Sequence, residues 1–164
     1  MPKQWLVYML CILSGLVSFG ANAQPVSQAT GDYANDLSTL YAERYSLQVL
    51  KDVCISAQPK TRAVLQKAYD EWRERHEDLI EDLDARFSAM IKRVSTDQKD
   101  YSRNYGKYQG AVMRLRQEQK DDLLALPREE LLKQCKELPG HLRSAKSDIP
   151  VKYPDEFKTV YGKK

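Results

Sequence analysis

Cysteines are the residues of this 164-residue chain whose chemistry the sequence constrains best. Cys11 lies in an apolar run near the N-terminus, while Cys54 and Cys135 stand far apart in the remainder. Thiols outside the cytosol oxidise to disulfides, and a zinc site would need more ligands than two cysteines and two distant histidines supply. A catalytic cysteine is the other alternative, but no nucleophile motif surrounds either residue. We therefore predict a Cys54–Cys135 disulfide with a structural role.

The two histidines, His76 and His141, are the other candidates for catalysis or metal binding. A di-iron bundle would need paired Glu-x-x-His motifs, but Arg73 stands three residues before His76. The chain also lacks C-x-x-C-H, G-x-S-x-G, H-E-x-x-H and a glycine-rich phosphate loop. His76 falls on an apolar helical face, where we expect a packed side chain held by one hydrogen bond. We predict no catalytic, metal-binding or cofactor-binding residue; an enzyme without a recognisable motif is the alternative.

The stretch YSRNYGKYQG, residues 101–110, is the one compositional oddity that suggests a binding surface. Its three tyrosines share one face of a predicted helix, which suits either a half-buried seam or a protein-binding hot spot. Gly106 and Gly110 weaken that helix by about 1 kcal/mol each relative to alanine, and they would let another chain approach closely. The candidate partner-binding residues are Tyr101, Arg103, Tyr105, Gly106, Lys107, Tyr108 and Gly110.

The N-terminus has the three-part pattern of a secretory signal peptide over residues 1–23. One cation, Lys3, precedes an apolar run over 5–19, and small residues at 21–23 match the site that signal peptidase reads. The alternative is an uncleaved membrane anchor, but a spanning helix needs about 20 apolar residues. We expect the exported chain to begin at Gln24 and to reside in the bacterial periplasm or outside the cell.

Apolar residues at helical spacing occupy most of the remaining chain. A first helix is predicted to begin near Asp32 or Asn35, either of which would cap it. The proline-containing segment 56–60 ends that helix, because proline cannot continue it. The next segment carries the longest apolar stripe and is predicted as one helix over 61–94.

A third helix is predicted after a chain reversal at residues 95–98, which contain the serine and glutamine of a capping box. One continuous helix through this point is the alternative. Pro127 ends the third helix and begins a short fourth one, which the sequence LPG at 138–140 is expected to stop. Two prolines make residues 141–164 mostly irregular, with a turn or two of helix at 155–161.

These segments predict an all-α fold, an antiparallel up-down bundle of about four helices with two long central ones and a mostly irregular tail. In this order Cys54 and Cys135 come to the same half of the bundle, so the disulfide staples the first helix to the last. The tail packs on the bundle or extends from it. The predicted segments are a signal peptide (1–23), a flexible leader (24–31), the bundle (32–140) and the tail (141–164).

Charge occurs in blocks, although the chain as a whole is only mildly basic. The formal net charge is +3 and the isoelectric point is near 8.7, too mild for a nucleic-acid binder. Eight acids lie between Asp70 and Asp84, and five bases lie between Tyr101 and Lys120. We predict that the two blocks neutralise each other along one seam. Alternatively, the acidic face receives a basic partner, or the basic face binds phosphate or anionic lipid.

The sequence indicates an exported, non-enzymatic helical module that acts by protein–protein contact as an inhibitor, immunity factor or assembly factor. Its expected partner is an unidentified protein, and a homodimer is among the candidates. We expect no nucleic acid, no cofactor and no integral membrane association after signal cleavage. The alternative is a periplasmic holdase-like chaperone, which would expose large apolar patches in its native state.

Overall fold

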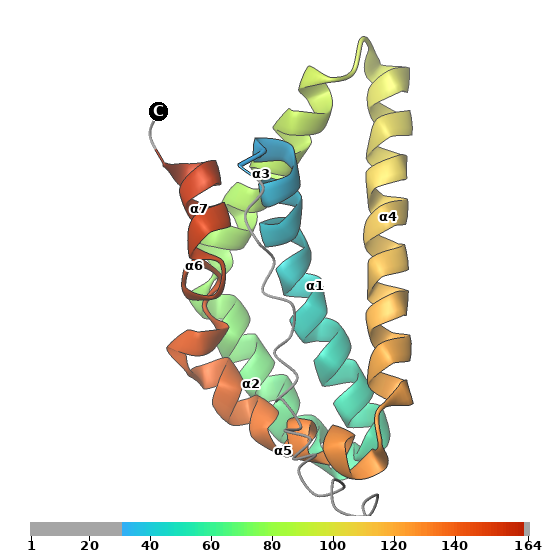
Figure 1. Cartoon of the computed structure of the whole chain (residues 1–164), viewed down its shortest axis with the longest axis vertical. Coiled ribbons are helices and arrows are strands. Elements are labelled where there is room, and N and C mark those ends of the chain that lie inside the picture. The colour runs from blue at the N-terminus through green and yellow to red at the C-terminus, as the bar shows by residue number, and fades with distance from the viewer. Residues whose placement is uncertain (1–30, 163–164) are drawn as a thin grey trace, which may run out of the picture.

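The computed structural model describes residues 31–162, and that range contains helices and no strand. The predictions for the signal peptide and for most of the leader lie outside the described residues. The all-α prediction is confirmed (Figure 1). The elements are α1 (Tyr33–Ala57), the 3₁₀ helix η1 (Pro59–Thr61), α2 (Arg62–Arg75), α3 (Glu77–Arg93), α4 (Gln98–Ala125), α5 (Arg128–Arg143), the 3₁₀ helix η2 (Ala145–Ser147), α6 (Ile149–Lys152) and α7 (Pro154–Tyr161).

The first helix, α1, is the one around which the others are arranged. It packs on α2, α3, α4, α5 and α7, and it runs through the middle of the molecule in Figure 1. Its apolar positions recur every three or four residues, and Leu40 and Cys54 are fully buried. Asp32 caps it as predicted, because its carboxylate accepts from the N–H groups of Ala34 at 2.8 Å and Asn35 at 3.0 Å. The central helix is therefore α1 rather than the two long helices that follow it.

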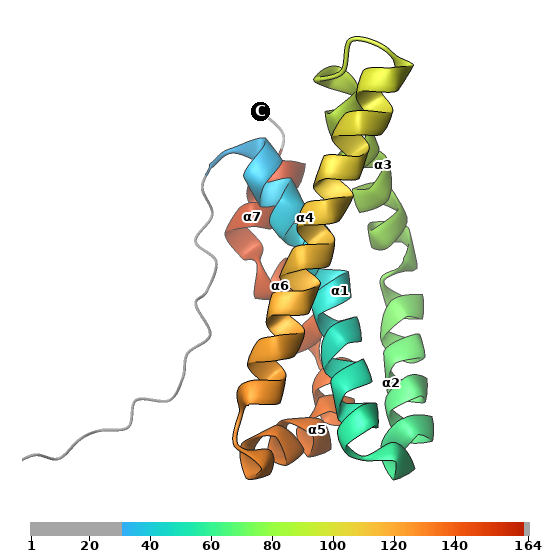
Figure 2. The same ribbon diagram turned by 90° about the vertical axis from the view of Figure 1, so that its right-hand side faces the viewer.

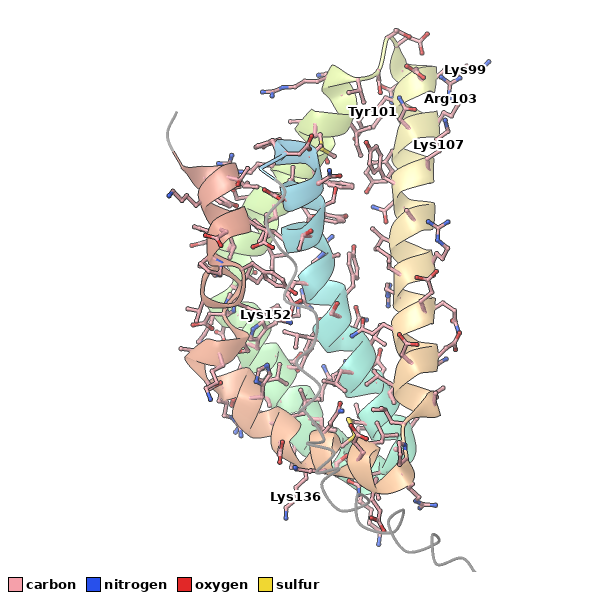
Figure 3. The ribbon with its side chains drawn as sticks, viewed as in Figure 1. Lys99, Tyr101, Arg103, Lys107, Lys136 and Lys152 are labelled. Carbon is pink, nitrogen blue, oxygen red and sulfur yellow. A yellow bond between two sulfur atoms is a disulfide. The ribbon has the colours of Figure 1, made fainter. Side chains whose placement is uncertain are left out.

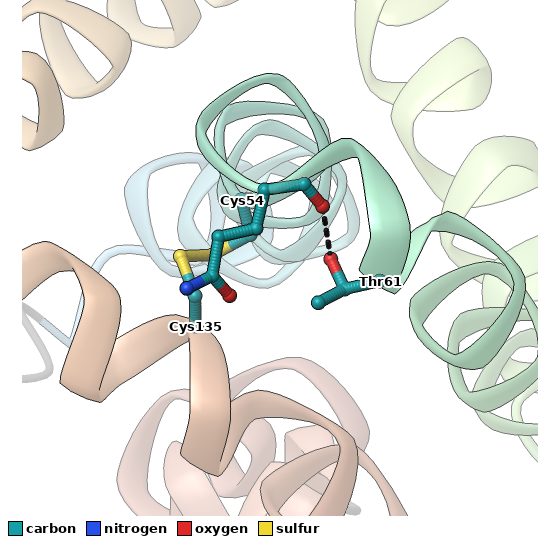
Figure 4. The surroundings of a disulfide bond; sticks show 4 residues. Cys54, Thr61 and Cys135 are labelled. Carbon is teal, nitrogen blue, oxygen red and sulfur yellow. Dashed lines mark hydrogen bonds between the residues drawn. A yellow bond between two sulfur atoms is a disulfide. The ribbon is translucent and has the colours of Figure 1, made fainter.

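The predicted disulfide is present and joins α1 to α5. The Cα atoms of Cys54 and Cys135 lie 5.2 Å apart, and both side chains are buried. Figure 4 shows the bridge beside the turn that leads from α1 into α2, where the Thr61 hydroxyl donates to the Gln58 carbonyl oxygen at 2.7 Å. Because α5 also packs on α1 and α2, the bridge fixes the end of the molecule where these three helices meet.

The prediction of one helix over 61–94 is wrong, because two helices meet at His76. The His76 backbone leaves the helical region (φ −113°, ψ 11°), and its N–H donates to the Arg73 carbonyl at 3.1 Å. In a continuous helix the His76 N–H would bond to the Trp72 carbonyl oxygen. Here the imidazole occupies that oxygen, with Nδ1 2.8 Å away. Its Nε2 lies 3.2 Å from a carboxylate oxygen of Asp148. A side chain that enters the backbone ladder in this way breaks the helix.

The predicted chain reversal between α3 and α4 is confirmed, although the capping residue differs. The two helices join through a tight turn at one end of the molecule (Figure 1). The N-cap of α4 is Asp97, whose carboxylate accepts from the Asp100 N–H at 2.8 Å. The Ser95 hydroxyl donates to the Ile91 carbonyl oxygen at 2.7 Å and so serves the end of α3. Aspartate caps a helix as well as serine does, so the start moves two residues along.

The fifth helix, α5, does not stop at the predicted LPG sequence but continues through Pro139 to Arg143. Leu138 and Leu142 lie one turn apart and are almost completely buried, and the Leu142 carbonyl accepts from Arg75 at 2.7 Å. Burying a leucine side chain contributes about 1.5–3 kcal/mol. This offsets much of the roughly 3 kcal/mol that a proline inside a helix costs. Packing therefore overrides the local stop signal.

The chain after α5 is mostly helical rather than mostly irregular, because buried polar contacts dock it on α1. Glu43 of α1 is only 2% exposed, and it accepts from Lys152 Nζ at 2.6 Å and from the Tyr153 hydroxyl at 2.6 Å. A buried carboxylate is stable only with such partners. The last helix, α7, packs along α1 and includes the turn or two of helix expected at 155–161. The tail therefore belongs to the folded domain.

Candidate functional site

Among the long helices of the described chain, α4 is the least buried. It packs on α1 and α3, and Val112 is its one buried residue among 28. In Figure 2, where α4 faces the viewer, no other described element lies in front of it. One side of α4 therefore packs on the bundle, while the opposite side is open to solvent along the length of the helix.

The three tyrosines of the candidate stretch lie on the inner side of α4. Tyr101, Tyr105 and Tyr108 are half-buried against the core, and Figure 3 shows Tyr101 pointing toward the bundle. The Tyr108 ring meets Phe87 of α3 edge-on, with the ring centroids 5.5 Å apart. Tyr101 and Tyr105 stack with centroids 5.9 Å apart. The Tyr108–Phe87 contact joins α4 to α3, and the Tyr101–Tyr105 stack lies within α4 on the same inner side; aromatic pairs of both kinds add to the packing of this seam.

The cations and glycines of the same stretch lie on the outer side. Arg103, Gly106, Lys107 and Gly110 are exposed. Figure 3 shows Arg103 and Lys107, with Lys99 one turn earlier, pointing away from the bundle. A helix turns by about 100° per residue, so ten consecutive residues cover every side of it. The structure therefore divides the candidate residues between two faces and does not bring the tyrosines together with the cations.

The exposed side of α4 continues beyond the stretch that the sequence singled out. Met113 is 59% exposed and Leu124 is 55% exposed. Steps of three or four residues from Gly110 stay on one side of a helix, so a helical projection of the sequence would have found the missing residues. The outer face of α4, as the term is used below, consists of Lys99, Arg103, Gly106, Lys107, Gly110, Met113, Arg114, Gln117, Asp121 and Leu124.

The cations of the outer face differ in whether the chain itself neutralises them. Lys99 and Lys107 form no ion pair within residues 31–162. Near the far end of the helix, Asp121 supplies a carboxylate that accepts from the Gln117 amide at 2.8 Å. The outer face therefore offers unpaired ammonium groups at one end and an exposed carboxylate at the other. The ion pairs within α4 are Arg103–Asp100 and Arg114–Glu118.

The prediction that the acidic block of α2 and α3 neutralises the basic block of α4 is wrong. Asp84 pairs with Arg44 of α1 at 2.6 Å, and Glu71 pairs with Arg143 of α5 at 2.8 Å. No ion pair of the described residues joins α2 or α3 to α4. For α2 the reason is the arrangement, because α1 lies between α2 and α4 (Figure 1). Helix α3 does pack on α4, but its Asp82 and Asp84 pair with Arg86 and Arg44 instead. The cations of the outer face consequently receive no compensation from the acidic block.

A second surface feature lies beside the disulfide, between the start of α2 and α5. It is a hollow of about 640 Å³ that includes the oxidised Cys135 and no histidine. Such a lining can bind apolar and anionic groups but offers no free thiol and no imidazole base. Figure 3 shows Lys136 at this end of the molecule. Its principal lining residues are Val64, Leu132, Pro139, Lys60, Lys133 and Lys136.

The histidines occupy positions within the packed fold. His76 is buried and held by the Trp72 carbonyl, which confirms the predicted packing. His141 is half-buried, and burial together with the nearby ammonium of Lys152 lowers the pKa of its imidazole. Within residues 31–162 no three His, Cys, Asp or Glu side chains form a group that could hold a metal ion. None of the described helices combines the length and apolar character needed to cross a bilayer.

Two tyrosines on and against α1, one buried and one half-buried, have the raised pKa values of groups held neutral by the fold. Burial, with the neighbouring Tyr45 hydroxyl, raises the pKa of Tyr41 to about 12. Burial and the adjacent Glu43 carboxylate raise the pKa of Tyr153 well above its ordinary value. Both hydroxyls make hydrogen bonds between segments, since Gln109 of α4 donates to Tyr41 at 3.2 Å. These groups therefore serve packing.

Comparison with known proteins leaves the outer face to be interpreted from its own residues. No protein-family model matches this chain, and no curated protein and no solved structure shows significant similarity to it. No residue role is therefore carried over from a relative. The outer face of α4 is the candidate functional site because of its exposure, its unpaired cations and its glycines.

Proposed function

We propose that this chain is an exported, non-enzymatic helical protein that binds a protein partner through the outer face of α4. One observation carries the proposal: a 28-residue helix leaves a complete face exposed, and its Lys99 and Lys107 have no ion-pair partner in the described chain. Unpaired cations on a fixed surface attract carboxylates of a partner and set the register of binding.

The inner contacts of α4 support a binding role because they hold the helix in place. Gln109 donates to the Tyr41 hydroxyl at 3.2 Å, and Gln119 donates to the Ser46 carbonyl oxygen at 3.1 Å. These two bonds tie the middle and the second half of α4 to α1. A surface that is ordered before binding loses less conformational entropy when a partner arrives, so the outer face is a preorganised one.

Export is supported by the pattern of residues 1–23 and by the disulfide. A small-residue cleavage site after an apolar run is typical of a secretory signal, and disulfides persist in oxidising compartments. Cys54 and Cys135 join helices that lie far apart in the sequence, as in many small exported domains. A disulfide-fixed binding module in the periplasm or outside the cell fits an inhibitor, an immunity factor or an assembly factor.

The described surface gives less support to a holdase-like chaperone. Such a protein grips unfolded chains with contiguous apolar surface, typically several hundred Å² or more. The exposed large apolar side chains in the described part of the chain are instead spread over several elements, at single positions or at positions separated by charged residues. They are Tyr33, Val64, Val94, Met113, Leu115, Leu124 and Val151.

Site-specific photocrosslinking in the native compartment tests the proposal. A photoreactive phenylalanine derivative is placed at Met113, an exposed apolar position of the outer face, so that Lys99 and Lys107 are kept. The matched control carries it at Ala63, an exposed position of α2. We expect a covalent protein adduct from position 113 and none from position 63. Absence of any adduct at 113, or equal adducts at both positions, would remove the outer face as the binding site.

A further inference from the structure

We infer that the partner bound by the outer face of α4 is a second copy of this chain, packed antiparallel about a twofold axis at Gly110. The inference rests on the proposed binding function of this face. It names the occupant and the orientation, which that proposal leaves open. Three features carry it: the glycines, the distribution of charge along the helix, and the exposed apolar side chain beside the axis.

Nothing within the described chain requires glycine at positions 106 and 110. A Cβ atom built on Gly106 or on Gly110 would meet no heavy atom within 4 Å, and among residues 31–162 the one glycine with positive φ is Gly31. Glycine in a helix interior is unfavourable relative to alanine. Its benefit at these positions must therefore come from outside the monomer, where a missing side chain lets two helix backbones approach closely.

The charges of the outer face match those of its own reversed copy. Lys99 and Asp121 stand eleven residues on either side of Gly110, close to three helical turns in each direction. In an antiparallel pair centred on Gly110, Lys99 of each copy faces Asp121 of the other, so the ion pair forms twice. A parallel pair would instead place Lys99, Arg103 and Lys107 against their own copies, and like charges repel.

The remaining positions of the outer face fit the same register. Arg114 comes opposite Gly106, where the absent side chain leaves room for a long guanidinium group. Lys107 comes opposite Met113, which is 59% exposed and can pack along the aliphatic stem of the lysine. No position of this arrangement sets two cations directly against each other.

The size of the face sets the strength of the association. A helix of 28 residues is about 40 Å long, and one helical face of that length buries less than the roughly 1,200 Å² of a standard interface. We therefore expect a weak dimer that dissociates on dilution. Because ion pairs of exposed groups are screened, the dimer should also weaken as salt is added.

Charge reversal with rescue tests the inference. The exported, disulfide-bonded protein is studied by sedimentation over a wide concentration range at low salt. Lys99→Glu and Asp121→Lys should each weaken the dimer by about tenfold, because each replaces two attractions by two repulsions. The double variant Lys99→Glu/Asp121→Lys should return to wild-type association. The matched control, Lys67→Glu on the exposed side of α2, should leave association unchanged.

Two results would overturn the inference. One is a chain that stays monomeric at every concentration; the other is a double variant that associates no better than its parents. Gly110→Ala adds a second readout, since it should raise the melting temperature and weaken the dimer together; a dimer of undiminished strength would contradict the close contact at this glycine. If position 113 crosslinks to a different protein while the chain remains monomeric, the inference fails and the proposed function stands. If position 113 crosslinks to nothing, both fail.

Discussion

The two long helices α1 and α4 lie side by side but use their surfaces in opposite ways. Helix α1 has 25 residues and buries eleven of them, including the carboxylates of Asp36 and Glu43. Helix α4 has 28 residues and buries one. α1 is surrounded by neighbouring helices, whereas α4 rests on the bundle by a single side. The fold therefore depends on α1, while α4 leaves a full face open to solvent.

The difference shows that length and periodicity do not reveal the role of a helix. Both segments have apolar residues at helical spacing, and α4 has in addition three tyrosines that resemble a hot spot. Those tyrosines face inward, and the outward residues are cations, glycines and isolated apolar side chains. On α4, exposure and not aromatic content therefore identifies the candidate face.

Removing the disulfide that anchors α1 should have the largest effect on the free energy of unfolding. Cys135→Ser removes the bridge to Cys54, which closes a loop between residues 81 positions apart. We expect a loss of about 4 kcal/mol in the free energy of unfolding, because the unfolded chain has more conformational entropy once the loop is no longer closed. Urea denaturation under oxidising conditions measures it. An unchanged midpoint would show that the bridge does not stabilise the end where α1, α2 and α5 meet.

Leucine truncations compare the two helices directly. Leu40 of α1 is fully buried, and Leu40→Ala should cost about 3 kcal/mol of unfolding free energy because it leaves a cavity. Leu124 of α4 is 55% exposed, and Leu124→Ala should cost less than about 0.5 kcal/mol. Both variants are measured by the same urea titration. Equal losses would contradict the contrast between the helices.

Truncating a tyrosine on the inner side of α4 should have an intermediate effect on the free energy of unfolding. Tyr108 is half-buried and its ring contacts Phe87 edge-on, so Tyr108→Ala should lower the unfolding free energy by about 2 kcal/mol. The exposed Met113 is the control on the same helix, and Met113→Ala should change stability by less than about 0.5 kcal/mol. A Tyr108→Ala protein as stable as wild type would indicate that the tyrosine side is also free for a partner.

The raised tyrosine pKa values around α1 make stability depend on alkaline pH. The fold keeps Tyr41 and Tyr153 neutral, with the pKa of Tyr41 raised to about 12. Their contribution is complete below the ordinary tyrosine pKa of about 10 and is lost as pH rises through the folded-state values, because the unfolded chain ionises first. Urea midpoints should therefore fall above about pH 10, with tyrosinate absorbance appearing as the protein unfolds. A constant midpoint across that range would contradict the assignment.

Much of the fold follows from local patterns in the sequence. The cap at Asp32, the reversal before α4 and the end of α4 before Pro127 are all local signals, and each agrees with the structure. The disulfide follows from the two cysteines that lie outside the secretory pattern, Cys54 and Cys135, and it too is confirmed. The cap, the reversal and the helix end depend on residues within one turn of each other, and the disulfide depends on how many cysteines can pair.

What the sequence missed depends on contacts between distant residues. The break at His76 involves Asp148, and the helical tail is docked by Glu43 through Tyr153, which stands 110 positions away. No pattern within one helix reports either contact. The missed half of the outer face is different, because its positions follow from Gly110 by helical steps alone. Its identity as a free face still required the structure, since only packing shows which side of α4 meets α1.

The most direct test of the contrast between α1 and α4 is one charge reversal on each helix, with stability and association measured together. Lys51 of α1 is 7% exposed and lies 4.6 Å from the Tyr69 ring centroid, so Lys51→Glu should lower the unfolding free energy by about 1 kcal/mol or more. Lys107→Glu on the outer face of α4 should leave it within about 0.5 kcal/mol of wild type and should weaken the adduct formed by an outer-face crosslinker at Met113. A destabilised Lys107→Glu protein that forms the adduct undiminished would contradict the assignment of binding to this face.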